Sequence, residues 1–265
     1  MGCAQILWTD TGDDAMVLPA GLIKFRNAFK SESVISNKLL SKKYKYTNYK
    51  SNDKNHFLFT RQYNSDLDVS ILFSYLQENI CNVAIMLGSP SVKSFYSTSV
   101  LSWQGIPLEI DQPVTIVAVD LVWLRWNCNP EDAILYRNDY DYSCSAGIER
   151  IFFDLESVGE EFIGRFQDKI SQAQMLMNLD SYIRNIDWGG APKSVSPYIY
   201  SAILFIVAGD LESARIALDK GLIAYATEVP RPAWEEVRLT EYQLRRSILV
   251  KHIEQQEKSD ANKRN

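Results

Sequence analysis

Apolar residues in this chain fall into segments with either helical or strand-like spacing. The clearest segment runs from Ser196 to Leu222. Residues 198–208 are apolar on nearly every side, which predicts a helix buried by several neighbours. Gly209 and Asp210 mark a tight turn, and a second helix follows with one apolar stripe at helical spacing: Ala214, Leu218, Gly221, Leu222 and Tyr225. The pattern predicts a helical hairpin.

The N-terminal half has a different pattern. The spacing of Leu22, Phe25 and Phe29 predicts an amphipathic helix that continues through Val34 to Leu40. Three segments rich in aromatic and β-branched residues then predict strands joined as antiparallel hairpins by short polar turns: His56–Tyr63, Leu67–Leu76 and Ile80–Leu87. Residues 94–103 are compatible with strand or loop. Residues 114–126 begin as a strand and end before a break at Pro130.

Beyond residue 150 the apolar spacing becomes helical. Apolar residues recur every three or four positions from Leu155 to Met177, which predicts one long amphipathic helix. A last helix is expected from Trp234 to Ile248, with a frayed tail from Glu254 onward because the tail has no apolar stripe. The fold class is therefore α+β, with a mainly antiparallel sheet in residues 1–150 and a helical part in residues 151–265. The sequence leaves open whether the two parts pack as one unit.

Charge is distributed unevenly over the 265 residues. The net charge is −5, yet residues 24–61 hold ten Lys or Arg against Glu32 and Asp53, a local net of +8, so the remainder carries −13. No apolar run approaches the ~20 residues needed to cross a bilayer, and the N-terminus lacks the basic start and apolar core of a signal peptide. We therefore expect a cytoplasmic protein with no membrane partner.

Residues that commonly carry catalysis are scarce. The four cysteines form no C-x-x-C pair, and the two histidines, His56 and His252, lie far apart without a surrounding motif. The glycine-rich loops that cradle nucleotide phosphates are also missing from the sequence. We expect no cofactor, no metal site and no enzymatic activity, although a carboxylate pair for glycoside hydrolysis would leave no trace in the sequence.

Two charged segments are candidates for binding. The first interleaves basic and aromatic residues, so that lysines would neutralise phosphates while tyrosines stack on bases. It predicts, as the alternative function, a nucleic-acid contact through Lys42, Lys43, Tyr44, Lys45, Tyr46, Tyr49 and Lys50. The same lysines also fit a solvated segment at a helix end, where they complement the helix dipole.

The second segment is acidic and runs from Asn129 to Glu161. It lacks the ligand spacing of a calcium loop. We interpret it as a negatively charged, aromatic-bearing surface that docks a basic protein, with a plain solvated acidic face as the competing interpretation. The predicted partner-binding residues are Glu131, Asp132, Asp139, Tyr140, Asp141 and Tyr142.

The helical hairpin resembles one tetratricopeptide unit. Five residues match the small and aromatic positions where the two helices of such a unit meet: Ala202, Phe205, Gly209, Ala214 and Leu218. The chain departs from the family at Gly221, where alanine is usual, and Pro230 comes late. We find no second copy with this spacing, whereas a solenoid needs several.

The layout of the whole chain resembles small cytoplasmic bacterial immunity proteins, which are found beside polymorphic toxins and contact-dependent inhibition systems. The resemblance rests on the order of a helix, a Lys/Tyr-rich turn, hairpin strands and a helical half that contains the segment GDLESARIAL. It implies a non-catalytic inhibitor that binds one cognate toxin, often through an acidic surface that masks a basic active site. No family binding residues are carried over, because no motif matches residue by residue.

Overall fold

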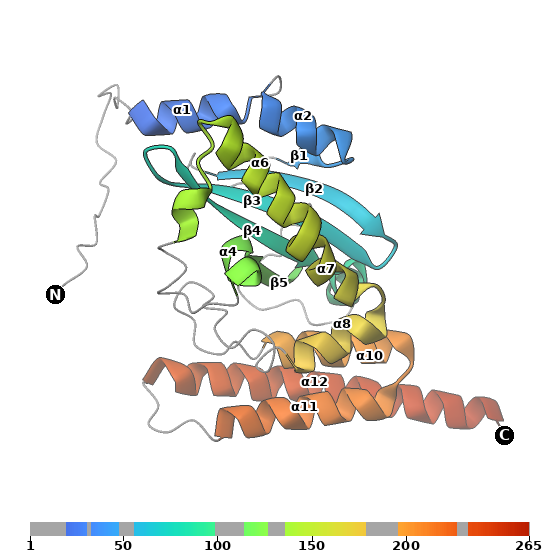
Figure 1. Ribbon diagram of the computed structural model, residues 1–265. Helices are drawn as coiled ribbons and strands as arrows, with labels where there is room; N and C mark the ends of the chain where they lie inside the picture. The colour runs from blue at the N-terminus through green and yellow to red at the C-terminus, as the bar shows by residue number, and fades with distance from the viewer. Residues whose placement is uncertain are drawn as a thin grey trace, which may run out of the picture.

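The computed structural model describes residues 20–30, 33–47, 56–98, 114–126, 136–178, 196–226 and 233–264 (Figure 1). Its centre is a five-stranded antiparallel sheet whose strands lie in chain order. The strands are β1 (Lys45–Thr47), β2 (His56–Asn64), β3 (Leu67–Gln77), β4 (Ile80–Gly88) and β5 (Thr115–Asp120). The predicted α+β class and the three predicted central strands are confirmed.

One face of the sheet carries most of the core. Phe59 lies opposite Ile71 on β3, and Ile71 lies opposite Ile85 on β4, so a continuous apolar row crosses the strands. These side chains are at most 1 % exposed. Two groups of helices cover this face: α1 (Ala20–Ala28) with α2 (Val34–Ser41), and the helical segment from Ser145 to Phe166 (Figure 1).

The predicted N-terminal helix is two helices. α1 ends at Ala28, and Ser33 caps α2 by accepting a hydrogen bond from the amide of Ser36 at 3.2 Å. The Ser36 hydroxyl donates to the carbonyl of Phe29 at 3.1 Å, which fixes the bend between the helices. The apolar spacing keeps its phase across this bend, so the pattern alone does not reveal it. Phe25 and Phe29 then pack on Phe57 of the sheet.

The segment directly after β4 is helical, which corrects the expectation of strand or loop over residues 94–103 as far as residue 98. Helix α3 (Pro90–Thr98) starts directly after β4, and Pro90 suits the first helical position because its missing N–H needs no partner there. The Ser89 hydroxyl accepts from the amide of Val92 at 3.4 Å. Residues 99–113 lie outside the described part of the chain.

After β5, α4 (Leu121–Trp126) begins with Asp120 accepting from the Val122 amide at 2.9 Å.

The prediction of one long helix over residues 155–177 is also wrong. The segment consists of α6 (Ser145–Asp154), a π-helical turn η2 (Leu155–Gly159), α7 (Glu160–Ile163) and a 3₁₀ turn η3 (Gly164–Phe166). Asp168 and Ser171 then form a capping box that starts α8 (Lys169–Met177). A capping box satisfies the free amides of a new helix, so the chain turns here although its apolar period continues.

The predicted helical hairpin is confirmed as α10 (Ser196–Ala208) and α11 (Leu211–Ala226), joined at Gly209 with φ of +82°. Helix α10 is buried by α8, α11, α12 and α3, as its apolar circumference requires. The final helix, α12 (Ala233–Arg264), is longer than expected. The tail that was predicted to fray from Glu254 is helical to Arg264, and Arg215 of α11 pairs with Glu257 within it.

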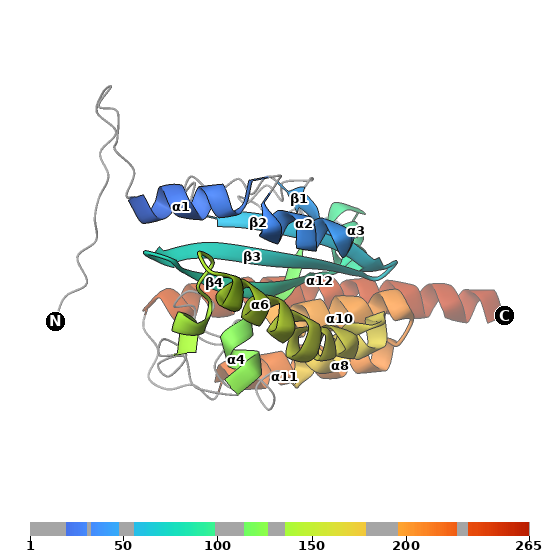
Figure 2. The same ribbon diagram turned by 45° about the horizontal axis from the view of Figure 1, so that its top comes forward.

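The two halves share one hydrophobic core. The boundary expected at residue 150 falls inside α6, and a single cluster of buried residues extends from Leu22 to Ile253. The C-terminal helices pack beside the β5 edge of the sheet through α10, at the opposite end from α1 and α2 (Figure 2). The sheet is therefore the platform that holds both charged segments in place.

Replacing Gly221 with alanine should lower the free energy of unfolding by about 2 kcal/mol, because a side chain there overpacks the helical layer. A Cβ at this position would lie 2.8 Å from the Cβ of Tyr198 and would collide with the Tyr242 hydroxyl, which donates to the Leu218 carbonyl. Urea unfolding of Gly221→Ala measures the effect. Gly164→Ala is the matched control, since nothing lies within 4 Å of its Cβ, and it should not destabilise the protein.

Candidate partner-binding surface

The acidic segment is only partly on the surface. Asp139 is exposed at the end of a 3₁₀ turn, η1 (Arg137–Asp139), and Asp141 is half-buried where it bridges to Ile80 of β4. The Asp141 carboxylate accepts from the amide and the hydroxyl of Ser143, at 2.8 and 2.6 Å, and so shapes the turn before α6. Glu131 and Asp132 lie outside the described residues.

Tyr140 and Tyr142 are buried, which removes them from the predicted partner-binding surface. The Tyr140 hydroxyl donates to the carboxylate of Asp154 at 3.0 Å, and burial raises the pKa of this phenol. The Tyr142 hydroxyl contacts the carbonyls of Gly21 and Glu78, and thereby ties α1 to the β3–β4 turn. The strand-like alternation of the segment Asp139–Tyr142 turns both rings inward.

Asp154 is the centre of a buried ion network behind the acidic surface. Its Oδ2 atom lies 3.2 Å from Nη1 of Arg125 and 3.3 Å from Nε of Arg150, while its side chain is 1 % exposed. Burial raises the pKa of the Asp154 carboxyl, and Arg125 and the Tyr140 hydroxyl oppose that rise. With three donors gathered at its Oδ2 atom, Asp154 is placed to hold the two arginines and Tyr140 together.

The two arginines in turn support exposed aromatic rings. The guanidinium of Arg125 lies 4.4 Å from the centre of the Trp126 ring, and Trp126 stacks on Tyr136 with ring centres 4.5 Å apart. On the next helix, Arg150 lies 5.5 Å from the ring of Phe153, which is 61 % exposed. Trp126 and Tyr136 are also exposed. The sequence interpretation placed Tyr140 and Tyr142 on this surface, but the exposed aromatic residues here are Trp126, Tyr136 and Phe153.

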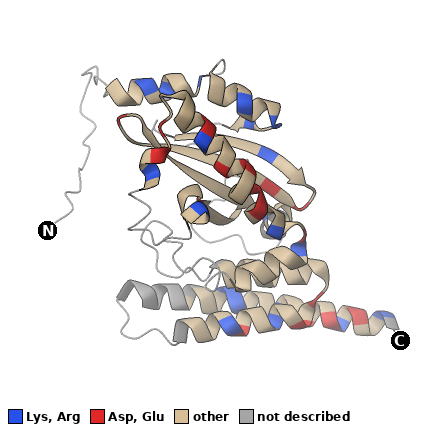
Figure 3. Cartoon of the chain, viewed as in Figure 1, with Lys and Arg blue, Asp and Glu red and all other residues tan. Residues whose placement is uncertain are grey.

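Carboxylates flank the exposed Phe153 in an acidic stripe along the chain. Glu149 lies one helical turn before Phe153 on α6, the exposed Glu156 lies in the π-helical turn η2, and the half-buried Glu160 begins α7. Figure 3 shows the resulting acidic colour along α6 and α7. We call the whole surface the acidic–aromatic ridge and define it by Trp126, Tyr136, Asp139, Glu149, Phe153, Glu156, Glu160 and Glu161.

Each carboxylate of the ridge has a partner within the protein. Asp139 pairs with Arg125 at 3.0 Å, Glu149 accepts from the Ser145 hydroxyl at 3.0 Å, and Glu161 pairs with Arg165 at 2.6 Å. Two further pairs reach across to the basic segment: Glu156 with Lys42, and Glu160 with Arg61. A pair whose two members are both accessible, such as Lys42 with Glu156, contributes little to stability, so a basic partner can exchange for it at small cost.

The Lys/Tyr segment is less suited to nucleic acid than its sequence indicates. Lys42 is engaged with Glu156 at 2.6 Å, and Tyr44 is buried with Arg61 stacked on its ring at 4.6 Å. Lys43, Lys45 and Tyr46 remain exposed. Tyr49 and Lys50 lie outside the described residues. Of the two described tyrosines that were predicted to stack on bases, only Tyr46 is therefore accessible.

No catalytic constellation is visible in the described part of the chain. It contains no group of three or more His, Cys, Asp or Glu that would hold a metal ion. The His56 Nδ1 atom lies 2.8 Å from the Ser74 hydroxyl across β2 and β3. Cys81 is buried, which raises the pKa of its thiol, and Cys144 caps α6 from an exposed position. None of the described helices combines the length and apolarity required to cross a membrane.

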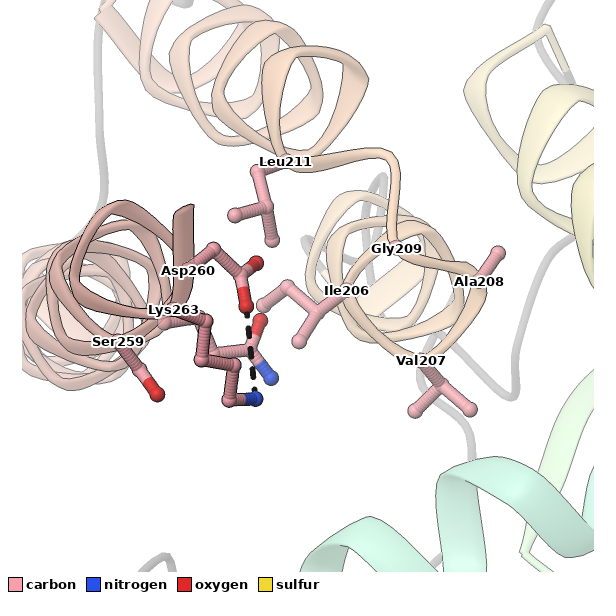
Figure 4. A pocket seen from close by; sticks show the side chains of 9 residues that line it. Ile206, Val207, Ala208, Gly209, Leu211, Ser259, Asp260 and Lys263 are labelled. Carbon is pink, nitrogen blue, oxygen red and sulfur yellow. Dashed lines mark ion pairs between the residues drawn. The ribbon is translucent and has the colours of Figure 1, made fainter. Parts of the chain in front are cut away.

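A groove of about 370 Å³ lies between the α10–α11 turn and the end of α12 (Figure 4). The apolar wall is formed by Ile206, Val207 and Leu211. The polar wall is formed by Ser259, Asp260 and Lys263. Asp260 and Lys263 pair with each other at 3.8 Å. The described residues of the lining include no histidine or cysteine, and the groove shares no residue with the acidic–aromatic ridge.

Comparisons with protein-family models, with curated proteins and with solved structures give no match for this chain. The resemblance to immunity proteins therefore stays a prediction from the sequence layout. The residues that the sequence interpretation missed are Trp126, Tyr136 and Phe153. Phe153 could have been found from the sequence, because it falls on the acidic stripe rather than on the apolar stripe of α6.

Replacing Asp154 with alanine should lower the free energy of unfolding by about 3 kcal/mol, because Tyr140 and the largely buried Arg125 lose their acceptor. Asp154→Asn should cost less, about 1 kcal/mol, since the amide oxygen still accepts from the Tyr140 hydroxyl. Urea unfolding gives both values. Asp260→Asn, which breaks only an exposed ion pair, is the control and should match the wild type; equal values for all three variants would contradict the network.

Proposed function

We propose that this protein is a non-catalytic protein-binding module that acts in the bacterial cytoplasm as an immunity protein and neutralises a basic toxin domain by direct binding. The observation that supports this proposal most is the acidic–aromatic ridge. It presents exposed aromatic rings among carboxylates, and the α6 helix that carries Phe153 buries Ile151 and Phe152 on its other side.

The ridge has the composition of a binding surface. Aromatic residues supply much of the binding energy at interfaces, and they work best when a ring of other residues excludes water around them. Phe153 has such surroundings, with Glu149 four residues before it and Glu156 three residues after it. The carboxylates would attract a basic partner over distance, and the ring would then fill an apolar recess on that partner.

The ridge is also held in one geometry before binding. Arg125 and Arg150 contact the exposed rings on one side and the buried Asp154 on the other. A surface that is already ordered loses less conformational entropy on association, which favours tight binding. A toxin inhibitor needs such affinity, because the toxin must remain covered at low concentrations.

Two variants test this function with a toxin domain that the wild-type chain captures by affinity. Glu156→Lys/Glu161→Lys should slow association and reduce its dependence on salt, because it removes long-range attraction. Phe153→Ala should instead raise the dissociation rate by about tenfold, because it removes the apolar contact. Surface plasmon resonance at several salt concentrations separates the two effects. Co-expression with the toxin in a growth assay tests protection.

Matched controls lie on α12, away from the ridge. Glu254→Lys/Glu257→Lys changes the same amount of charge on two exposed residues, and Leu244→Ala truncates an exposed apolar side chain comparable to Phe153. Both controls should bind and protect like the wild type. A wild-type chain that fails to protect against that toxin would refute the immunity function. Protection that survives all changes to the ridge would instead assign binding to another surface.

A further inference from the structure

The outer side of α1, α2 and β1 is strongly basic. Between Ala20 and Thr47 the described residues include seven Lys or Arg and no Asp or Glu; Glu32 is the only acid in this stretch of the sequence and lies outside them. Figure 3 shows basic colour on α1 and α2 without acidic colour. Lys24, Lys30, Lys43 and Lys45 are all exposed.

The same side carries exposed apolar side chains. Ile23, Val34, Leu40 and Tyr46 are between 46 % and 59 % exposed, although α1 and α2 are short helices with an apolar face already in the core. Leu22 and Phe25 of α1 and Ile35 and Leu39 of α2 fill that buried face. Burial in the core therefore does not explain the outer group.

Helix geometry places these apolar and basic side chains together. Ile23 and Lys24 lie on the side of α1 that faces away from Phe25, and Val34 lies on the side of α2 that faces away from Leu39. Lys30 follows the end of α1 and is exposed. Tyr46 contacts Phe57 and Phe59 with one side of its ring, so its exposed side continues the surface past α2. In Figure 2 this layer lies farthest from the C-terminal helices.

We propose that this surface binds the anionic face of a lipid bilayer. We call it the cationic rim and define it by Ile23, Lys24, Lys30, Val34, Leu40, Lys43 and Tyr46. Lysines beside a bilayer gain from its negative surface potential, while exposed aliphatic and tyrosine side chains enter the boundary between headgroups and acyl chains. The rim combines both features on one side of the molecule.

The composition of the rim favours lipid over nucleic acid. A single-stranded nucleic acid needs aromatic platforms and a basic groove along its backbone. Here three of the four exposed apolar residues are aliphatic, Tyr44 is buried, and Lys42 is paired with Glu156. The expectation of no membrane partner came from the absence of a spanning segment, which has no bearing on binding at the surface.

The test is co-sedimentation of the full chain with vesicles. Binding is expected to phosphatidylcholine vesicles that contain about 30 % phosphatidylglycerol and not to pure phosphatidylcholine. It should be lost between about 50 and 500 mM salt, where screening shortens the reach of the lysines. Lys24→Glu/Lys30→Glu should reduce the partition coefficient by at least roughly tenfold, since each lysine at the surface contributes about fivefold. Ile23→Ser/Val34→Ser should weaken binding even at low salt.

Controls of the same type lie on α12. Lys251→Glu/Lys258→Glu and Leu244→Ser change exposed residues away from the rim and should bind like the wild type. Thermal unfolding of every variant identifies loss of fold, and Lys24→Gln/Lys30→Gln replaces the charge reversal if that variant is unstable. No binding to anionic vesicles at low salt would overturn the proposal. So would equal losses in the control variants, or tighter binding of an oligothymidylate than of the vesicles.

Discussion

The buried carboxylate of Asp154 is the interaction on which the ridge depends. It holds Arg125 from α4, Arg150 from α6 and the hydroxyl of Tyr140 at one point behind the surface. A charge with so little access to water is tolerated only where its partners are positioned for it. The three segments that meet there must therefore keep their places, and the rings of Trp126 and Phe153 keep theirs with them.

Ion pairs within the molecule neutralise part of the uneven charge along the chain. Lys42 and Arg61 of the basic half pair with Glu156 and Glu160 of the acidic half, and Lys38 lies over the ring of Phe152. The π-helical turn lies at this contact, where Gly159 lets the backbone approach Ile85 of the sheet. The basic and acidic segments are thus joined by ion pairs rather than separated as opposite poles.

The fold class, the central strands and the helical hairpin were predictable because local spacing determines them. The breaks at Ser33 and Asp168 were not, since side-chain caps interrupt the helices while the apolar period continues unchanged. The ridge was predictable only as a charged region. Tyr140 points inward because its hydroxyl contacts Asp154, fourteen residues away. The sequence does not reveal this contact, because it does not show whether a given carboxylate is buried or exposed.

The order of the strands affects how the chain folds as it is synthesised. Each strand pairs with the one made just before it, so the sheet closes few long loops and can be complete once Asp120 has left the ribosome. The helices from Ser145 onward that cover Ile71 and Ile85 have not yet emerged from the ribosome at that moment. We expect the nascent chain to expose this apolar face for a time, which makes it a substrate for chaperones during synthesis.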